Sequence, residues 1–587
     1  MFFSILLINT AYAEDNLTSD DFSSVQSLID DAKSGDTVHL ENKTYEGNGS
    51  AIKINKDITI YGDDSSGTVL DANYKSRIFE ISSKVKVNIF GITFVNGRTV
   101  SNGAAIESNG ALTVHDSKFI NNNGDYGGAI RGSSGSITVY NSVFENNYGD
   151  GGGAAIDCYQ TTTKVINCTL LNNNAHEGGA IYNRFSDIEL INSTFINNSA
   201  TRGGGIYNNR GYLLVKNSRF YNNSASHLGA GVKSWGYCDI YDSDIRYNVG
   251  LWGGGVYVSE YTMNIKNTVI DSNYADEGAG ILADSQGKLI IEDSVVSNNN
   301  ANIGGGLCGS TGNITAINCE IINNVAADNG GGISSTLGSI AGIQFACNLY
   351  NTTLKNNSAP NGGALCFGPI VGNFENVIIE NNSATMGGAI FNAGNLTFNS
   401  LTIKSNTADT GGAVYNEGSL TLHDSNLDNN DADKGCAVYN MGTLTLNRSN
   451  LNSHNSPGNG VIYNDGNLSI INSSLNSNLA NDGVIYNNAN LYLKDSKMAD
   501  NKAKGFGGAI YNAGNLDIYG CEFDSNEADI AGVIYNSGDS TSIRDSLFEN
   551  NLAQRGAVIY SDEDFTISNS KFQNNIVSHS LGIIEVL

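Results

Sequence analysis

The sequence predicts an all-β fold, a right-handed single-stranded parallel β-helix built from many short coils. Three observations support this fold class: a repeat of about 22–25 residues, strands of three to five residues with alternating polarity, and very little proline. The chain of 587 residues contains 69 glycines and only 3 prolines, and proline cannot donate to a strand ladder. Because a repeat protein grows in one dimension, this length does not require several globular domains.

The repeat is clearest when the coils are aligned on the hydrophobic residue that follows Gly-Gly-Ala or a related triplet. Successive aligned residues are about 23–26 positions apart, with one longer interval between Ile333 and Leu365. The aligned residues are Ile106, Ile130, Ile156, Ile181, Ile206, Val232, Val256, Ile281, Leu307, Ile333, Leu365, Ile390, Val414, Val438, Ile462, Ile485, Ile510, Ile534 and Ile559.

Each coil is expected to hold three short strands joined by turns. In the coil from Gly178 to Arg202, strands are expected around Ile181, over 188–191 and over 195–196. Asn192 marks a bend, because asparagine tolerates the left-handed region and bonds its own backbone. Stacked coils should place the inward residues in apolar columns and the bend asparagines in side-chain amide ladders.

The two ends of the chain differ from the repeats. Residues 1–13, which end in Ala11-Tyr12-Ala13, have the pattern of a signal peptide. Residues 14–34 are expected to cap the first coil with a short amphipathic helix, and 35–587 to form the β-helix. The last segment, 581–587, is similar to the first strand of a further coil, and an uncapped coil of this kind would favour end-to-end association.

Charge and cysteine content narrow the function. The net charge is −27, which disfavours nucleic acid and anionic membranes as partners. No apolar run is long enough to span a membrane. The nine cysteines are too few for a disulfide scaffold and are expected to be mostly buried and unpaired. Pairing of Cys158 with Cys168, or of Cys308 with Cys319, is the alternative.

The repeats resemble those of polymorphic outer-membrane proteins, in which a GGA[ILV] motif alternates with an FxxN motif. GGAI or GGAV stands at Gly127–Ile130, Gly178–Ile181, Gly387–Ile390, Gly411–Val414 and Gly507–Ile510. FxxN stands at Phe119–Asn122, Phe144–Asn147, Phe195–Asn198, Phe220–Asn223, Phe548–Asn551 and Phe572–Asn575. The opening segment is similar to the first coil of pectin-lyase-like β-helix proteins, and the whole chain to the adhesin-like surface proteins of methanogenic archaea. The resemblance implies this fold and a secreted or cell-surface location.

One group of coils departs from the plain repeat. Both tryptophans of the chain fall there, with other aromatic and arginine residues at turn positions that should stack. Flat rings stack on sugar rings, and arginine binds hydroxyl or carboxylate groups, so this stripe is a candidate glycan-binding site. The alternative is that these side chains only pack on neighbouring coils. The stripe comprises Tyr159, Arg184, Phe185, Arg210, Trp235, Trp252 and Tyr261.

The remaining residues do not indicate catalysis. The turns are short and uniform, whereas β-helix lyases and hydrolases place clustered carboxylates in a groove walled by long loops. The seven histidines are scattered and show no metal-ligand spacing, so neither a catalytic residue, a metal nor a cofactor is expected. The function expected is a non-catalytic, adhesin-like protein that binds surface glycans or other cells. The alternative is a secreted polysaccharide lyase or glycoside hydrolase of the pectin-lyase-like class.

Overall fold

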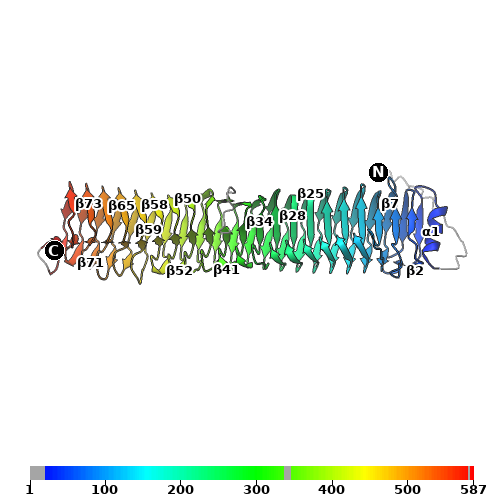
Figure 1. The fold of residues 1–587 in the computed structure, drawn as a ribbon, viewed down its shortest axis with the longest axis horizontal. Helices are drawn as coiled ribbons and strands as arrows, with labels where there is room; N and C mark the ends of the chain where they lie inside the picture. Colours follow the sequence, from blue (N-terminus) through cyan, green and yellow to red (C-terminus); the bar gives the residue numbers. More distant parts are fainter. Residues whose placement is uncertain (1–19, 336–344, 580–581, 587) are drawn as a thin grey trace, which may run out of the picture. The chain divides into compact units, whose positions relative to one another are not determined.

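The computed structural model describes residues 20–335, 345–579 and 582–586, and it confirms the right-handed parallel β-helix. The chain divides into two compact units, Met1–Ile290 and Ile291–Leu587, called here the N-terminal and C-terminal units. Within each unit, short strands of successive coils lie side by side (Figure 1). The segment predicted to be a signal peptide, residues 1–13, lies outside the described residues.

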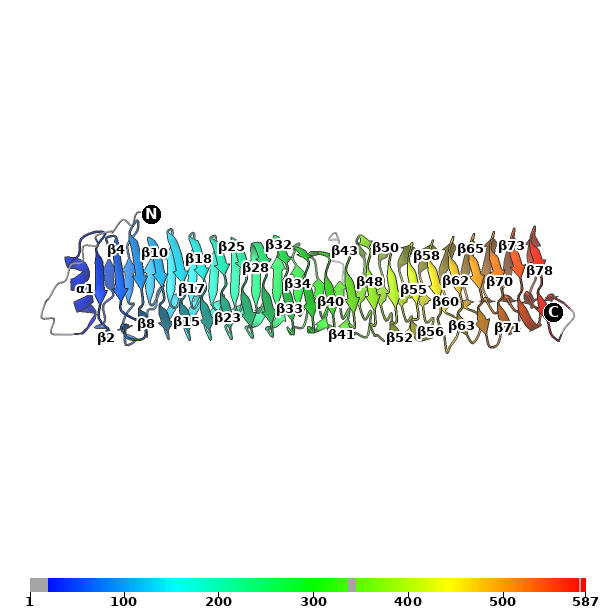
Figure 2. The ribbon, with the colours of Figure 1, turned by 180° about the vertical axis from the view of Figure 1, so that it is seen from behind.

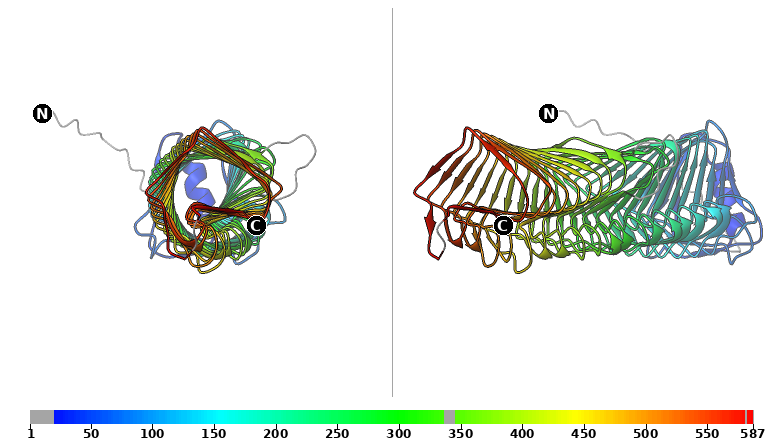
Figure 3. Two further views of the ribbon diagram at one scale, coloured as in Figure 1. Left: turned by 90° about the vertical axis from the view of Figure 1, so that its left-hand side faces the viewer. Right: turned by 60° about the vertical axis from the view of Figure 1, so that its left-hand side comes forward.

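The predicted N-terminal helix is present as α1 (Phe22–Asp31), drawn in blue in Figure 3. Asp21 caps it, because its side chain accepts hydrogen bonds from the backbone amides of Ser23 and Ser24 at 2.9 and 3.3 Å. Phe22, Val25 and Ile29 are buried. Through this apolar face the helix contacts the first strands, β1 (Thr37–Leu40), β2 (Thr44–Glu46) and β3 (Ile52–Ile54).

A coil of the N-terminal unit contains one strand more than expected. The three predicted strands are β21 (Ile181–Arg184), β22 (Asp187–Ile191) and β23 (Thr194–Ile196). A fourth strand, β24 (Ser199–Arg202), pairs in parallel with β20 (Asn174–Glu177) and β27 (Ser224–Leu228). It carries no hydrophobic alternation, and its backbone pairing alone makes it a strand, so the residue pattern did not predict it.

Stacking in register builds the apolar core. In β22 the side chains of Ile188 and Leu190 are fully buried, and Leu190 lies beside Val165 of β18 (Thr162–Ile166). The phenylalanines of the FxxN motifs form a second inward column. The rings of Phe119 and Phe144 are stacked, with centroids 4.6 Å apart and nearly parallel planes. In each column, every coil contributes one hydrophobic residue, and the stacked residues form a continuous core.

The bends have the backbone conformation that the sequence predicts. Asn141 and Asn192 both have φ of 50°, and the side-chain amide of Asn141 donates to Asp116 at 3.1 Å. Gly178 has φ of 62°, and a Cβ atom there would lie 2.2 Å from the carbonyl oxygen of Ile181. The first glycine of the triplet is therefore required both for its conformation and for its lack of a side chain.

A second amide ladder, which the sequence did not predict, runs inside the fold. It is formed by the asparagines that end the FxxN motifs and by asparagines at the equivalent position of other coils, such as Asn173. In the N-terminal unit the side-chain amide of Asn147 donates to Asn173 at 3.0 Å, and that of Asn173 donates to Asn198 at the same distance. All three are buried. Because each amide also bonds backbone groups, the ladder satisfies polar atoms that would otherwise be costly to bury.

The C-terminal unit carries two further columns. Buried Asn416, Asn440 and Asn464 form a ladder with successive amide bonds of 2.7 Å. Next to them, tyrosine rings stack from coil to coil, for example Tyr439 on Tyr463 with centroids 5.2 Å apart. Their strands β57 (Val438–Asn440) and β60 (Ile462–Asn464) pair in parallel, and β60 is labelled in Figure 2.

The cysteines behave as small core residues. Cys158 and Cys168 are both buried free thiols, so the alternative disulfide between them is not formed. The Cys319 thiol donates to the carbonyl oxygen of Ile317 at 3.3 Å. Burial raises the pKa of the Cys168 thiol to about 11, which makes it unreactive at neutral pH.

Candidate functional site

The residues of the predicted stripe lie on two sides of one strand column rather than in a single row. Tyr159, Arg184 and Trp235 share a column, with Asn209 between the last two. Tyr159 and Arg184 end the strands β17 (Ile156–Tyr159) and β21. Asn209 and Trp235 lie within the longer strands β25 (Ile206–Lys216) and β28 (Val232–Tyr241), and the four residues are called the turn-side column. Phe185 and Arg210 each follow it at the next position.

The other two predicted residues lie apart from that column. Trp252 ends β30 (Val249–Trp252), on the opposite side of the Gly-Gly turn, beside Leu228 in the adjacent strand. Its ring centroid is 4.8 Å from that of His227. Tyr261 follows β31 (Val256–Ser259), and its ring meets Tyr237 edge-on at 5.2 Å. Trp252 belongs to a loop-side column that also contains Glu177, Arg202 and Leu228.

Between these two columns lies a middle column that sequence reasoning missed. It holds the residue directly after each aligned hydrophobic residue, and its side chains are 0–8% exposed. The middle column consists of Arg131, Asp157, Tyr182, Tyr207, Lys233 and Tyr257. The three columns, together with Phe185, Arg210 and Tyr237 next to the turn-side column, are called the aromatic–cation band. Its signal in the sequence is the recurrence of tyrosine, arginine or lysine directly after the aligned residue.

One end of the band is a buried ion cluster. The fully buried carboxylate of Asp157 accepts hydrogen bonds from Arg131 and Arg184, with nitrogen–oxygen distances of 2.8 Å to each. Burial raises the pKa of Asp157, and the two guanidinium groups oppose this effect. The Arg184 guanidinium also lies 4.1 Å from the ring centroid of Tyr126 and 5.2 Å from that of Tyr159. Arg184 is therefore committed to contacts within the protein.

The centre of the band contains a second charged group. The Lys233 ammonium lies 3.7 Å from the ring centroid of Tyr207, and burial lowers its pKa to about 8. Arg202 forms an ion pair with Glu177 at 2.9 Å. Burial raises the pKa of Glu177, while Arg202 and Lys233 oppose the shift. These groups place an amine, a phenol and a guanidinium in one small region.

The outer edge of the band presents aromatic surface to solvent. The Arg210 guanidinium lies 4.4 Å from the Trp235 ring centroid, and the Asn209 amide donates to the Tyr182 hydroxyl at 3.0 Å. Phe185 and Tyr237 are 50% and 57% exposed. Five buried polar atoms of the band have no hydrogen-bond partner among the described residues: Nε of Arg131, Oε2 of Glu177, Nε of Arg202, Oδ1 of Asn209 and Nε1 of Trp235.

Each unit also has a groove across the strands that follow the buried asparagine ladder. In the N-terminal unit the polar groove has a volume of about 610 Å³ and a floor of Ala175, Ala200 and Ala225. In the C-terminal unit the charged groove has a volume of about 530 Å³ and a floor of alanines that includes Ala503 and Ala528. Both volumes fall in the usual range for ligand sites.

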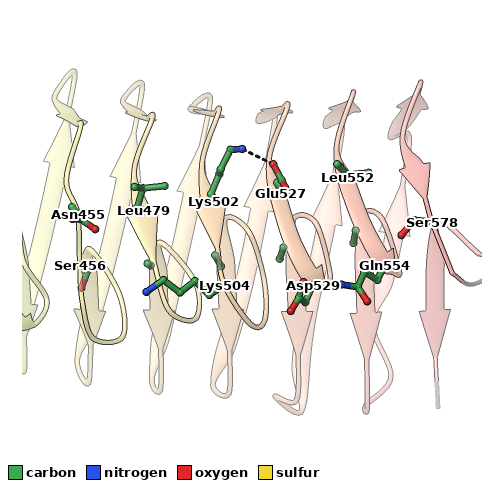
Figure 4. A pocket seen from close by; sticks show the side chains of 14 residues that line it. Asn455, Ser456, Leu479, Lys502, Lys504, Glu527, Asp529, Leu552, Gln554 and Ser578 are labelled. Atoms are coloured by element: carbon green, nitrogen blue, oxygen red, sulfur yellow. Dashed lines mark hydrogen bonds and ion pairs between the residues drawn. The ribbon is translucent and has the colours of Figure 1, made fainter.

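The two grooves differ in their walls. Figure 4 shows that Leu479 and Leu552 stand at either side of an ion pair between Lys502 and Glu527, whose atoms are 2.6 Å apart. Lys504, Asp529 and Gln554 form the opposite wall, and Gln554 donates to Asp529 at 2.9 Å. The polar groove has hydroxyl and amide side chains at most of the corresponding positions.

The described residues also bear on metal sites and on membrane-spanning helices. Over residues 20–335, 345–579 and 582–586, no group of three or more His, Cys, Asp or Glu side chains is placed to hold a metal ion. Within the same ranges, no helix is long and apolar enough to cross a membrane.

Comparison with known families agrees with the coil architecture. Residues 442–583 match the model of the right handed beta helix region, which is the class that the parallel sheets define. Residues 192–209, which include the Phe195–Asn198 motif, match the Chlamydia polymorphic membrane protein repeat. The chain is therefore a β-helix with repeats like those of polymorphic membrane proteins. No curated protein matches the sequence.

Solved structures show only a distant likeness. The catalytic domain of a GH87 alpha-1,3-glucanase, in complex with nigerose, is 13% identical with a TM-score of 0.35, over 62% of this chain and 66% of that domain. The PL6 family alginate lyase AlyGC is 10% identical with a TM-score of 0.26, over 94% of this chain and 99% of that one. A PL6 alginate lyase in complex with a trisaccharide is 13% identical with a TM-score of 0.28, over 68% of this chain and 84% of that one. Scores this low carry no argument about function.

Proposed function

We propose that the protein is a non-catalytic, adhesin-like protein of the cell surface that binds glycans through the aromatic–cation band. The supporting observation is the concentration of unpartnered buried polar atoms in that band. Leaving such an atom unpaired costs about 1–3 kcal/mol. Proteins tolerate departures of this kind mainly at functional sites. Outside the band, buried asparagines such as Asn147 and Asn173 pair in a ladder, and the unpartnered atoms on Asn183, His423 and Asn447 do not form a group of this size.

The chemistry of the band suits a sugar ligand. Phe185 and Tyr237 offer exposed ring surface, and aromatic rings pack against the apolar faces of pyranoses. Arg210 is an exposed residue whose guanidinium group can donate to hydroxyl or carboxylate oxygens. The repetition of coils places these groups side by side, so several sugars of one glycan can be contacted at once.

A glycan array with the purified protein tests this proposal. Trp235→Ala and Trp252→Ala remove one ring from each side of the band, and we expect at least a tenfold loss of affinity for the ligand found. Tyr61→Ala is the matched control, because Tyr61 is an exposed aromatic residue outside the band. Unchanged binding by both tryptophan variants would remove the band as the glycan site.

The proposed location is also open to a direct test. Antibody labelling of intact cells, and release of the protein by external protease, should both detect the protein if it lies at the surface. Detection only after cell lysis would contradict the proposal.

The alternative, a secreted polysaccharide lyase or glycoside hydrolase, is favoured by one observation. Lys233 combines a pKa of about 8 with a position beside Tyr207 and near Arg202, and an amine of lowered pKa can act as a general base. Against it, Lys233 is only 5% exposed. Assays for unsaturated products and for new reducing ends distinguish a lyase or hydrolase from a non-catalytic protein. Turnover that disappears in Lys233→Met would replace the adhesin proposal with an enzyme.

A further inference from the structure

The polar groove of the N-terminal unit has walls whose chemistry the fold itself does not require. One wall carries Tyr148, Asn174, Ser199, Ser224 and Val249, one residue from each of five neighbouring strands. These strands are β16 (Tyr148–Gly152), β20, β24, β27 and β30. The charged groove of the C-terminal unit occupies the same place in its coils but has leucine, lysine and glutamate in this wall.

The opposite wall of the polar groove is equally rich in hydrogen-bonding groups. It consists of Asp150, His176, Thr201 and Ser226. Each coil therefore offers about one donor or acceptor on either side of the alanine floor. The groove extends over four strand spacings between Tyr148 and Val249, or about 19 Å at about 4.8 Å per strand. This length accommodates several pyranose rings of a linear glycan that lies across the strands.

Exposed aromatic rings flank the row of polar side chains. Tyr148 is 41% exposed at one end of the wall. At the other end, Tyr274 is 48% exposed and its backbone pairs with that of Val249, which extends the same wall by one coil. Rings at the two ends can stack on sugar rings while the serine and asparagine side chains between them bond hydroxyl groups.

Charge restricts the class of glycan. The lining of the polar groove contains no lysine or arginine and one carboxylate, Asp150, and the whole protein has a net charge of −27. An anionic polysaccharide would meet repulsion from both. We infer that the polar groove binds a linear, neutral glycan with its chain across the strands from Tyr148 to Val249. The inference rests on the proposed glycan-binding function but assigns it a second site, separate from the aromatic–cation band.

Titration calorimetry with defined hexasaccharides tests the inference. The neutral probes are cellohexaose, xylohexaose and mannohexaose, and the acidic probes are hexamers of galacturonate and guluronate. We expect at least one neutral hexamer to bind, and the acidic hexamers to bind at least tenfold more weakly. Ser199→Leu and Ser224→Leu fill the groove and should each weaken neutral binding at least tenfold. Ser199→Ala, which removes one hydroxyl without filling the groove, should cause a smaller loss.

Two controls separate this inference from the proposed function. Leu479→Ala changes the charged groove and should leave binding unchanged, and near-ultraviolet circular dichroism should show that every serine variant remains folded. Neutral binding that depends on Trp235 and Trp252 but not on Ser199 or Ser224 would overturn the inference and leave the band proposal in place. Preferential binding of an acidic hexamer, or binding of no hexamer, would also overturn it.

Discussion

The carboxylate of Asp157 is fully buried and accepts two hydrogen bonds from Arg184, at 2.8 and 3.2 Å. Arg131 donates to the same carboxylate at 2.8 Å. One buried carboxylate therefore pairs with two guanidinium groups, and the side chains of Arg131 and Arg184 are only 10% and 17% exposed. The stability of this end of the aromatic–cation band depends on that single carboxylate.

Replacement of Asp157 by alanine should be strongly destabilising. The change leaves two largely buried cations without a counter-ion, and loss of one partner of a buried pair costs about 3–5 kcal/mol. Thermal and urea unfolding followed by circular dichroism measure the loss. Asp517→Ala is the control, because Asp517 pairs with Arg544 at 2.9 Å where both side chains are more than 40% exposed, and it should cost less than about 1 kcal/mol. Equal losses in the two variants would contradict the expectation.

His454 gives the C-terminal unit a predictable dependence on pH. It replaces an asparagine in the buried ladder, with Nδ1 3.2 Å from Oδ1 of Asn478 and Nε2 3.5 Å from Nδ2 of Asn430. Burial lowers the pKa of His454 to about 4, while the bond to Asn478 opposes the shift. Since the unfolded chain binds this proton more tightly, stability is complete above pH of about 6.5 and falls as the pH drops to about 4.

The size of this effect follows from the shift in pKa. A difference of about 2.5 pKa units lowers the free energy of unfolding by about 3 kcal/mol between pH 6.5 and 4. Urea unfolding at a series of pH values measures it. His454→Asn restores the amide ladder and should remove this part of the pH dependence. If the variant and the parent lose the same stability between pH 6.5 and 4, His454 does not titrate as described.

The buried amide ladder should contribute more to the free energy of unfolding than the exposed one. Asn440 accepts a bond from Asn416 and donates to Asn464, both at 2.7 Å, and all three are fully buried. Asn440→Ala removes one hydrogen bond from the Asn416 amide and one to the Asn464 amide oxygen, at about 0.5–1.5 kcal/mol each. Asn490 makes the same pair of bonds at 2.8 Å on the surface, so Asn490→Ala should cost less than about 1 kcal/mol, because water replaces its partners. Equal losses of stability in thermal unfolding would show that burial is not the deciding factor.

The sequence predicted the features that one coil determines by itself. The inward position of Ile181 follows from alternation within its own strand, and the left-handed bend at Asn192 follows from the residue type. The buried ladder was not predicted. Asn198 stands in a polar Asn-Asn pair that resembles an exposed turn, and only the bond to the next coil shows that its side chain faces inward.

The candidate site was predicted in its members but not in its arrangement. Trp235 and Trp252 were assigned to one stripe, whereas the structure places them on opposite sides of the strand column that contains Lys233. Tyr207 was missed because alternation places it on the outer face of its strand, where it should be exposed. The Tyr182 ring and the Lys233 ammonium group lie against the Tyr207 ring, which is only 4% exposed. These neighbours come from adjacent coils, so no pattern within one coil predicts them.

Replacement of Lys233 by methionine should stabilise the N-terminal unit. Burial lowers the pKa of Lys233 from 10.5 to about 8, so the unfolded chain holds the proton more tightly than the folded one. Stability therefore rises as the pH increases from about 8 to 10.5, and at pH 7 the full cost of about 3 kcal/mol is present. Methionine fills a similar volume without a charge and should raise the unfolding free energy at pH 7 by up to that amount.

The control for this prediction is Lys434→Met, because Lys434 is exposed and lies 4.4 Å from the Tyr463 ring centroid. It should change stability by less than about 1 kcal/mol. The gain from Lys233→Met should shrink towards zero as the pH rises to 10.5 and above, since the lysine is by then neutral in the folded protein and only half protonated in the unfolded chain. A destabilised Lys233→Met variant would mean that the contact with Tyr207 and the attraction of Glu177 outweigh the cost of burial. Lys233 would then have to be treated as a structural cation.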